Sequence, residues 1–193
     1  MSSVLPHGSA GPAIPVGRRR RPPATVVVRP RPGRPTEGLL AYGGRVEPCA
    51  LGSGGIRRRK REGDGATPAA AMRLLGALWR ADRGRRPSTA LPGRAVRADD
   101  GWCDAPRSGL YNRPVRLPFT ASHETLVRAD GLYDLLVVLD FNLGPRRAFG
   151  GSAIFLHCAR PGLAPTAGCV ALPAARLARL LARLPRRARL VVL

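Results

Sequence analysis

Glycine and proline interrupt the apolar stretches of this chain so often that few of them can continue as helices. The 193 residues include 23 glycines and 20 prolines. Both residues favour turns, and proline also removes a backbone N–H that helices and central strands need. Short apolar runs between turns are typical of strands. The pattern therefore predicts a mainly β fold, and the length suits one domain with one hydrophobic core.

The N-terminal segment, residues 1–23, differs from the rest of the chain. It is rich in Gly, Pro, Ser and Arg and has no hydrophobic period, so we expect a disordered basic tail. One catalytic domain is then expected over residues 24–193. The apolar run that follows Arg18–Arg21 is too short for the hydrophobic core of a secretion signal, and a charged residue ends it. No signal peptide is therefore visible. No stretch is apolar for long enough to span a bilayer.

In the first half of the chain, hydrophobic patterns predict a strand at Val26–Val28 and a β-hairpin. The hairpin pairs Gly38–Tyr42 with Arg45–Leu51 across a Gly43–Gly44 turn, a known two-residue connection. Residues 69–80 fit either a helix or a strand by composition. Turn formers and arginines dominate residues 81–121, so we expect a long excursion there.

In the second half, apolar runs at Tyr133–Phe141, Gly150–Cys158 and Gly168–Leu172 predict buried strands. Pro173 suits the first position of a helix, whose leucines form one apolar stripe at positions 177, 180, 181 and 184. A last strand is expected at Arg189–Leu193. The predicted fold is a β-sandwich of mixed sheets with a helix after the strand that begins at Gly168.

The formal charge of +21 suggests a polyanionic partner, either nucleic acid or an anionic envelope polymer. Lys60 is the only lysine, however, and Arg, Ala, Gly and Pro all have GC-rich codons. The arginine tracts also lack the interleaved aromatic residues on which single-stranded nucleic acids stack. We therefore favour compositional bias and a solvated surface, and expect no nucleic-acid partner. A non-catalytic, basic nucleic-acid-binding protein remains an alternative.

The four cysteines are Cys49, Cys103, Cys158 and Cys169. They form no CxxC pair and their spacing matches no zinc module, so no metal site is expected. They are too few for a disulfide scaffold in a chain of this length. Strand alternation should turn Cys158 away from its neighbour His157, which predicts a structural thiol in the core.

The segment Gly151–Leu172 carries a pattern suited to thiol chemistry. His157 ends an apolar strand, and Cys169 follows a glycine at the start of another. Neighbouring strand ends could bring the two side chains within hydrogen-bond reach, where the imidazole could accept the thiol proton. The N–H groups around Gly168 and Cys169 could hold an oxyanion, and Thr166 could donate a further hydrogen bond. The residues alone leave open a cysteine hydrolase or two structural side chains.

The same segment resembles the signature of the L,D-transpeptidase (YkuD-like) family: a histidine, a Gly-containing turn, then Ser/Thr-x-Gly-Cys. Here the last element is Thr166-Ala167-Gly168-Cys169. Lys60–Pro68 resembles the family's Gly…Thr-Pro element. Three further elements, in the right order, resemble a bacterial branch of this family: Gly101–Asp104, Tyr111–Val115 and Gly151–His157. The resemblance covers roughly Val26 to Leu193. Family members often carry Arg two residues after the cysteine, where this chain has Ala171.

The resemblance implies a cysteine acyltransferase that acts on peptidoglycan stem peptides without a cofactor. Cys169 would be the nucleophile and His157 the general base and acid. The residues implied for oxyanion or substrate binding are Gly168, Thr166, Ser152, Trp102, Tyr111 and Asn112, of which the last three could equally anchor a loop. An L,D-carboxypeptidase or amidase that uses the same pair with water is the alternative. The substrate implies the periplasm or cell envelope, and we expect a monomer.

Overall fold

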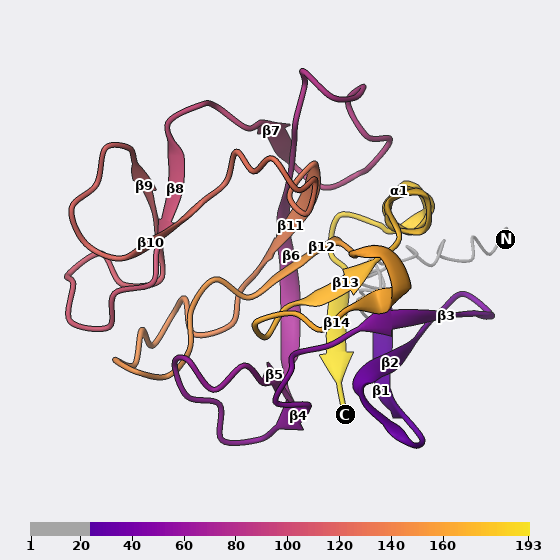
Figure 1. Ribbon diagram of the computed structural model, residues 1–193. Helices are drawn as coiled ribbons and strands as arrows, with labels where there is room; N and C mark the ends of the chain where they lie inside the picture. The colour runs from indigo at the N-terminus through magenta and orange to yellow at the C-terminus, as the bar shows by residue number, and fades with distance from the viewer. Residues whose placement is uncertain (1–23) are drawn as a thin grey trace, which may run out of the picture.

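The computed structural model describes residues 24–193, and it confirms the mainly β class with mixed sheets (Figure 1). The largest sheet has nine strands in the order β11-β12-β13-β3-β2-β1-β14-β6-β7. Because β11 also pairs with β6, this sheet closes on itself. A three-stranded sheet, β10-β8-β9, and a two-stranded sheet, β4-β5, complete the fold. The expectation for residues 1–23 lies outside the described residues.

The strands of the largest sheet are, in chain order, β1 (Thr25–Arg31), β2 (Arg34–Tyr42), β3 (Arg45–Ala50), β6 (Ala71–Trp79), β7 (Gly93–Ala95), β11 (Leu135–Leu139), β12 (Phe155–Cys158), β13 (Val170–Leu172) and β14 (Arg189–Val192). The smaller sheets contain β4 (Ile56–Arg57), β5 (Thr67–Pro68), β8 (Asp100–Cys103), β9 (Arg113–Arg116) and β10 (His123–Thr125). A short 3-10 helix, η1 (Pro161–Leu163), and one α-helix, α1 (Ala174–Arg183), lie among the last strands.

The N-terminal strands agree with the hydrophobic pattern and extend beyond it. Gly43 and Gly44 both have positive φ and form the predicted hairpin turn between β2 and β3. Strand β1 continues past the apolar run to Arg31, where the register with β2 shifts at Pro30–Arg31. Such an irregularity accommodates a proline, which cannot donate to the ladder.

The segment 69–80, which composition left undecided, forms strand β6 between β14 and β11. Residues 81–121 do not form a single excursion, because β7, β8 and β9 lie within them. Strand β8 is buried throughout. Its Asp100 carboxylate accepts hydrogen bonds from Arg94 and Arg116, so the arginines that argued for a loop instead neutralise a buried charge.

Strand β12 is shorter than the strand that we predicted at Gly150–Cys158, because the backbone before Phe155 is irregular. Gly151 and Ala153 both have positive φ, which is incompatible with a regular strand. From Phe155 onwards, β12 pairs antiparallel with β11 and parallel with β13. The strand that carries His157 is therefore an internal strand of the closed sheet.

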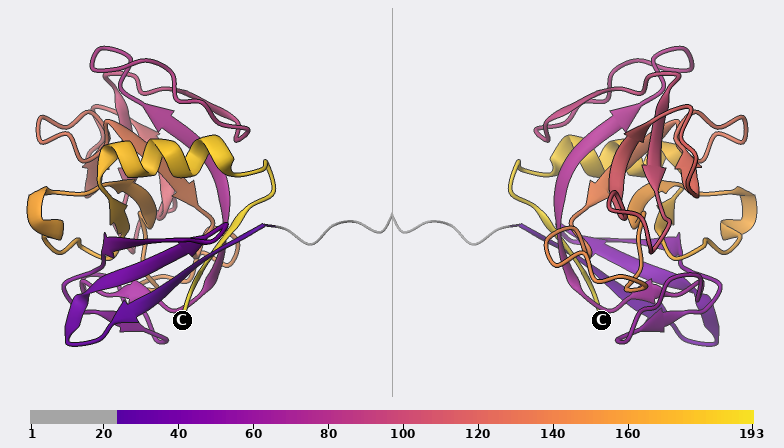
Figure 2. Two further views of the ribbon diagram at one scale, coloured as in Figure 1. Left: turned by 90° about the vertical axis from the view of Figure 1, so that its right-hand side faces the viewer. Right: turned by 90° about the vertical axis from the view of Figure 1, so that its left-hand side faces the viewer.

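Helix α1 follows β13 directly, as the leucine stripe predicted. Pro173 is its N-cap rather than its first helical residue. Leu177, Leu180 and Leu181 are buried in the main core, with residues of β1, β2 and β14 among their cluster. The views in Figure 2 show the helix crossing the large sheet. Among the described residues, no helix is long and apolar enough to cross a membrane.

A second, smaller core joins the closed sheet to the three-stranded sheet. Its buried members are Trp102, Leu126, Leu132, Tyr133, Leu136, Phe155 and Cys169. Cys158 belongs to the main core instead, which confirms that it points away from the face of His157. All four cysteines are buried and free.

Candidate active site

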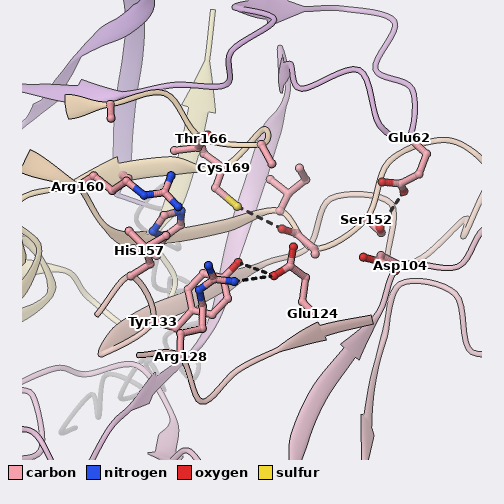
Figure 3. A pocket seen from close by; sticks show the side chains of 16 residues that line it. Glu62, Asp104, Glu124, Arg128, Tyr133, Ser152, His157, Arg160, Thr166 and Cys169 are labelled. Atoms are coloured by element: carbon pink, nitrogen blue, oxygen red, sulfur yellow. Dashed lines mark hydrogen bonds and ion pairs between the residues drawn. The ribbon is translucent and has the colours of Figure 1, made fainter. Parts of the chain in front are cut away.

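The strands β12 and β13 bring His157 and Cys169 to one cavity. Their parallel register pairs Leu156 with Val170 and His157 with Ala171, which leaves Cys169 level with Phe155. Side chains two positions apart on a strand share a face, so the thiol and the imidazole lie on the same side of the sheet. Both line a cavity of about 170 Å³ (Figure 3). Two residues that are twelve positions apart in sequence therefore meet at one site.

The resting thiol makes two hydrogen bonds, and neither involves His157. Sγ of Cys169 donates to the carbonyl of Ala153 at 3.2 Å and accepts from the N–H of Phe155 at 3.3 Å. In this state the thiol is engaged with backbone atoms, and a contact between thiol and imidazole stays a prediction. The register explains this arrangement, because Cys169 is level with Phe155 and lies diagonally to His157. Rotation of the thiol away from Ala153 would be needed for proton transfer.

Burial keeps both members of the pair neutral. His157 is 4% exposed and Cys169 is 7% exposed. Desolvation raises the pKa of the Cys169 thiol to about 12 and lowers the pKa of His157 to about 4. At neutral pH the site therefore holds a thiol and an uncharged imidazole, rather than a thiolate and an imidazolium.

The ring of His157 is held in one orientation by its neighbours. Its Nδ1 lies 2.8 Å from the carbonyl oxygen of Cys158. A carbonyl can only accept, so Nδ1 carries the proton and Nε2 carries the lone pair. Tyr133 packs its ring against the imidazole in an edge-to-face arrangement, with centroids 5.3 Å apart. This arrangement supplies a base whose basic nitrogen is defined.

Two threonine hydroxyls hold the backbone of the cysteine. Thr166 Oγ1 donates to the Cys169 carbonyl at 2.7 Å and accepts from the Gly168 N–H at 3.1 Å. Thr67 Oγ1 also donates to the Cys169 carbonyl, at 3.4 Å, and accepts from the Gly52 N–H at 2.8 Å. The Gly168 N–H is thus used within the loop, and its expected role as an oxyanion donor stays a prediction. Thr166 lines the cavity, but its hydroxyl serves the same loop.

Gly168 is required at its position by sterics. Its φ is +136°, a conformation that side-chain-bearing residues rarely adopt. A Cβ at this position would lie 2.8 Å from the carbonyl oxygen of Ala66. The glycine therefore lets the cysteine loop approach the segment that leads into β5.

Trp102, Tyr111 and Asn112 are buried behind the cavity and do not line it. The indole N–H of Trp102 donates to Asn112 Oδ1 at 3.0 Å. The same oxygen accepts a hydrogen bond from the N–H of Ala153, whose carbonyl in turn accepts the hydrogen bond from the Cys169 thiol. Of the two readings left open by the sequence, the contacts favour anchoring of the loop over contact with a substrate.

Ser152 does line the cavity, and its hydroxyl is engaged by Glu62. Ser152 Oγ donates to Glu62 Oε2 at 2.7 Å. The hydroxyl of Tyr111 donates to the same carboxylate oxygen and accepts from the Gly151 N–H at 3.0 Å. Glu62 therefore ties the loop before β5 to the segment before β12.

Sequence reasoning missed several residues that line the cavity: Glu62, Asp104, Glu124, Arg128, Tyr133 and Arg160. Glu62 and Asp104 stand inside elements that already resembled the family, so their positions carried a signal. The other four lie in stretches that look like ordinary surface or strand sequence. No group of three or more His, Cys, Asp or Glu side chains within residues 24–193 is arranged to hold a metal ion.

Comparison with known protein families gives one match. A family model described as the L,D-transpeptidase catalytic domain, YkuD, matches residues 34–192. No curated protein and no solved structure gave a significant match. The matched range contains His157, Cys169 and every other residue that lines the cavity.

Proposed function

Because this chain belongs to the YkuD family of L,D-transpeptidase catalytic domains, we propose that it is a cysteine acyltransferase acting on peptidoglycan stem peptides. The observation that carries this proposal is the shared cavity of Cys169 and His157. The nucleophile comes from the loop before β13 and the base from β12, and the register of these two strands fixes their relative position. The substrate lies in the cell envelope, which is where the proposed activity belongs.

The first half of the reaction forms a thioester. Sγ of Cys169 turns from the Ala153 carbonyl and attacks the carbonyl of the third residue of a tetrapeptide stem. Nε2 of His157 accepts the thiol proton as the C–S bond forms. The resulting oxyanion is stabilised by backbone N–H groups, for which the Cys169 N–H remains the candidate because Gly168 donates to Thr166. Collapse breaks the peptide bond, and His157 protonates the departing amino group of the fourth residue.

The second half transfers the acyl group to an amine. The side-chain amine of a neighbouring stem attacks the thioester carbonyl, and His157 accepts its proton. Collapse expels the sulfur, which recovers the proton from His157, and a new amide cross-links the two stems. With water as acceptor, the same steps would trim the stem by one residue, which is the carboxypeptidase alternative.

A neutral resting pair suits this order of events. The pKa of about 12 for Cys169 and of about 4 for His157 mean that little thiolate exists before substrate binds. Proton transfer must therefore accompany attack, so His157 acts as a true general base. This also limits side reactions of the thiol in the absence of a donor.

The test is intact-mass spectrometry of the protein with a carbapenem, a β-lactam that mimics the acyl donor. The proposal expects one covalent adduct on the wild-type protein and none on Cys169→Ser. The same proteins are then incubated with tetrapeptide muropeptides. Cross-linked dimers support acyl transfer, and trimmed monomers alone support hydrolysis. If the folded wild-type protein forms no adduct and releases no product, a catalytic role for Cys169 is refuted.

A further inference from the structure

A second groove lies outside the thiol cavity, between helix α1 and the hairpin of β2 and β3. Its volume is about 280 Å³. In the left view of Figure 2, the yellow helix crosses in front and the indigo hairpin lies below it. Ala171 lines the thiol cavity, whereas the next residue, Leu172, lines this groove. Adjacent residues of a strand point to opposite faces, so β13 separates the two sites.

The helical wall of the groove is cationic. All three arginines of α1, Arg176, Arg179 and Arg183, line the groove, at positions i, i+3 and i+7. This spacing places their side chains along one edge of the helix. The helix contains no acidic residue that could neutralise them. It therefore presents a row of positive charges to the groove.

The hairpin wall adds an aromatic ring, a fourth arginine and one carboxylate. Tyr42 on β2 is the register partner of Arg45 on β3, and both line the groove. Glu47 is the one anion among the lining residues, and it pairs with Arg176 at 2.8 Å. Arg45 and Arg179 are exposed, and no hydrogen bond or ion pair engages either side chain in the part of the chain that the structure describes. Two of the four guanidinium groups can therefore bind an anion without breaking an existing contact.

The remaining lining is apolar, which narrows the class of ligand. Leu40, Leu172 and Leu180 line the groove together with the arginines. A polyphosphate-like polymer has no apolar part to bury against them. A peptide strand added to β3 would need backbone N–H donors, and Pro48 within β3 has none. An acyl chain with an anionic headgroup fits both parts, because the chain covers the leucines and the headgroup pairs with the arginines.

We propose that this groove binds an anionic phospholipid at a membrane surface. The phosphate pairs with Arg45 and Arg179, and one acyl chain lies along the leucines of the groove. This inference goes beyond the proposed acyl transfer and does not depend on it. Because β13 separates the groove from the thiol cavity, a bound lipid holds the protein at the membrane and leaves the cavity around Cys169 unobstructed.

The test is co-sedimentation of the full chain with vesicles that differ in headgroup charge. Vesicles of phosphatidylglycerol mixed with phosphatidylcholine are compared with vesicles of phosphatidylcholine alone, at about 0.1 M salt. The double variant Arg45→Gln, Arg179→Gln should bind the anionic vesicles about thirtyfold more weakly than the wild type. The matched control is Arg58→Gln, Arg59→Gln, which removes the same charge from two exposed arginines that do not line the groove. Its binding should fall by less than about threefold.

Equal losses in the two double variants would show a general effect of charge and would overturn the groove site. Equal binding of the wild type to both kinds of vesicle would overturn it as well. Polyphosphate should bind the two double variants equally, and a loss confined to the groove variant would assign the groove to a polyanion instead of a lipid.

A phosphatidylglycerol with a photoreactive acyl chain tests the apolar part of the groove. Mass spectrometry should find the label on peptides that contain Leu40, Leu172 or Leu180, and labelling confined to other peptides would contradict the proposal. Carbapenem acylation of Cys169 should be the same in both double variants and the wild type. Failure of lipid binding is thus distinguishable from failure of the proposed function, in which Cys169 forms no adduct.

Discussion

The carbonyl oxygen of Cys158 lies 2.8 Å from Nδ1 of His157 and thereby decides which ring nitrogen is basic. The residue that orients the base is thus its own neighbour on β12. Cys158 itself is packed in the main core, on the opposite face of the strand. The orientation of the imidazole therefore depends on a backbone atom that side-chain substitutions leave in place.

The neutral thiol leads to a prediction about alkylation. Iodoacetamide should modify Cys169 slowly at about pH 7, and the rate should keep rising with pH beyond about pH 9, because the pKa of the buried thiol is about 12. Peptide mapping separates Cys169 from the other three cysteines, and Cys169→Ser supplies the blank. A rate that is constant between about pH 5 and pH 8 would instead reveal a thiolate–imidazolium pair.

The depressed pKa of His157 predicts a loss of stability in acid. The folded-state pKa is about 4, below the value of about 6.5 expected in the unfolded chain. The unfolded state therefore binds the extra proton first, and stability falls as pH decreases from about 6.5 towards 4. The free energy of unfolding should drop by about 2 kcal/mol between pH 7.5 and pH 5. Urea denaturation at several pH values measures this drop.

The matched control for that experiment is His157→Gln, which cannot titrate in this range. Its unfolding free energy should change less over the same pH interval than that of the wild type. An identical pH dependence in both proteins would show that other groups, and not His157, cause the acid sensitivity.

Because a Cβ at position 168 would clash with the backbone, we predict that Gly168→Ala lowers stability and Cys169 acylation much more than Gly162→Ala does. Both glycines have positive φ and lie on the connection between β12 and β13. A Cβ at Gly162 meets nothing within 4 Å, whereas one at Gly168 meets the Ala66 carbonyl at 2.8 Å. Gly162→Ala should cost about 1 kcal/mol of stability from backbone strain alone. Gly168→Ala should cost more and also slow carbapenem acylation of Cys169.

Thermal denaturation and adduct formation measured on both alanine variants check this prediction. Equal acylation rates for the two variants would mean that the loop relaxes around the new methyl group without moving the thiol.

We predict that replacing the Glu62 carboxylate lowers the free energy of unfolding more than replacing a surface carboxylate does. Glu62 accepts hydrogen bonds from the hydroxyls of Tyr111 and Ser152, and Glu62→Gln weakens both. Hydrogen bonds to charged groups contribute about 1.5–3 kcal/mol, so a loss of about 2 kcal/mol is expected. Glu47→Gln, which breaks an ion pair to an exposed arginine, should cost less than about 1 kcal/mol. Similar denaturation midpoints for the two variants would contradict the linking role of Glu62.

The sequence predicted the elements whose hydrophobic pattern is local. The Gly43–Gly44 hairpin, the buried strands of the second half and the leucine stripe of α1 all depend on neighbours within a few residues. The sheet β10-β8-β9 was missed because its strands are only three or four residues long and β9 contains arginines. The pairing of Arg116 with Asp100 is visible only after folding. Closure of the large sheet was missed for a related reason, since the pairing of β6 with β11 joins distant segments.

The residues of the candidate site also fall into those that motifs in the sequence identify and those that only the folded structure identifies. His157, Cys169, Thr166 and Ser152 were found from motifs, and all four line the cavity. Trp102 and Asn112 were also named, but a linear motif cannot distinguish a residue that touches a ligand from one that supports the loop. Asp104 and Arg160 follow strand ends, and only the register of those strands brings their charges to the same cavity.

The two strands that form the site are not equally constrained. Strand β12 has β11 on one side and β13 on the other, whereas β13 meets β3 at a single residue pair, Ala171 with Ala50. The base is therefore held by strand pairing on both sides. The sulfur relies more on its loop, where the hydroxyls of Thr67 and Thr166 hold the Cys169 carbonyl in place of a second long strand pairing.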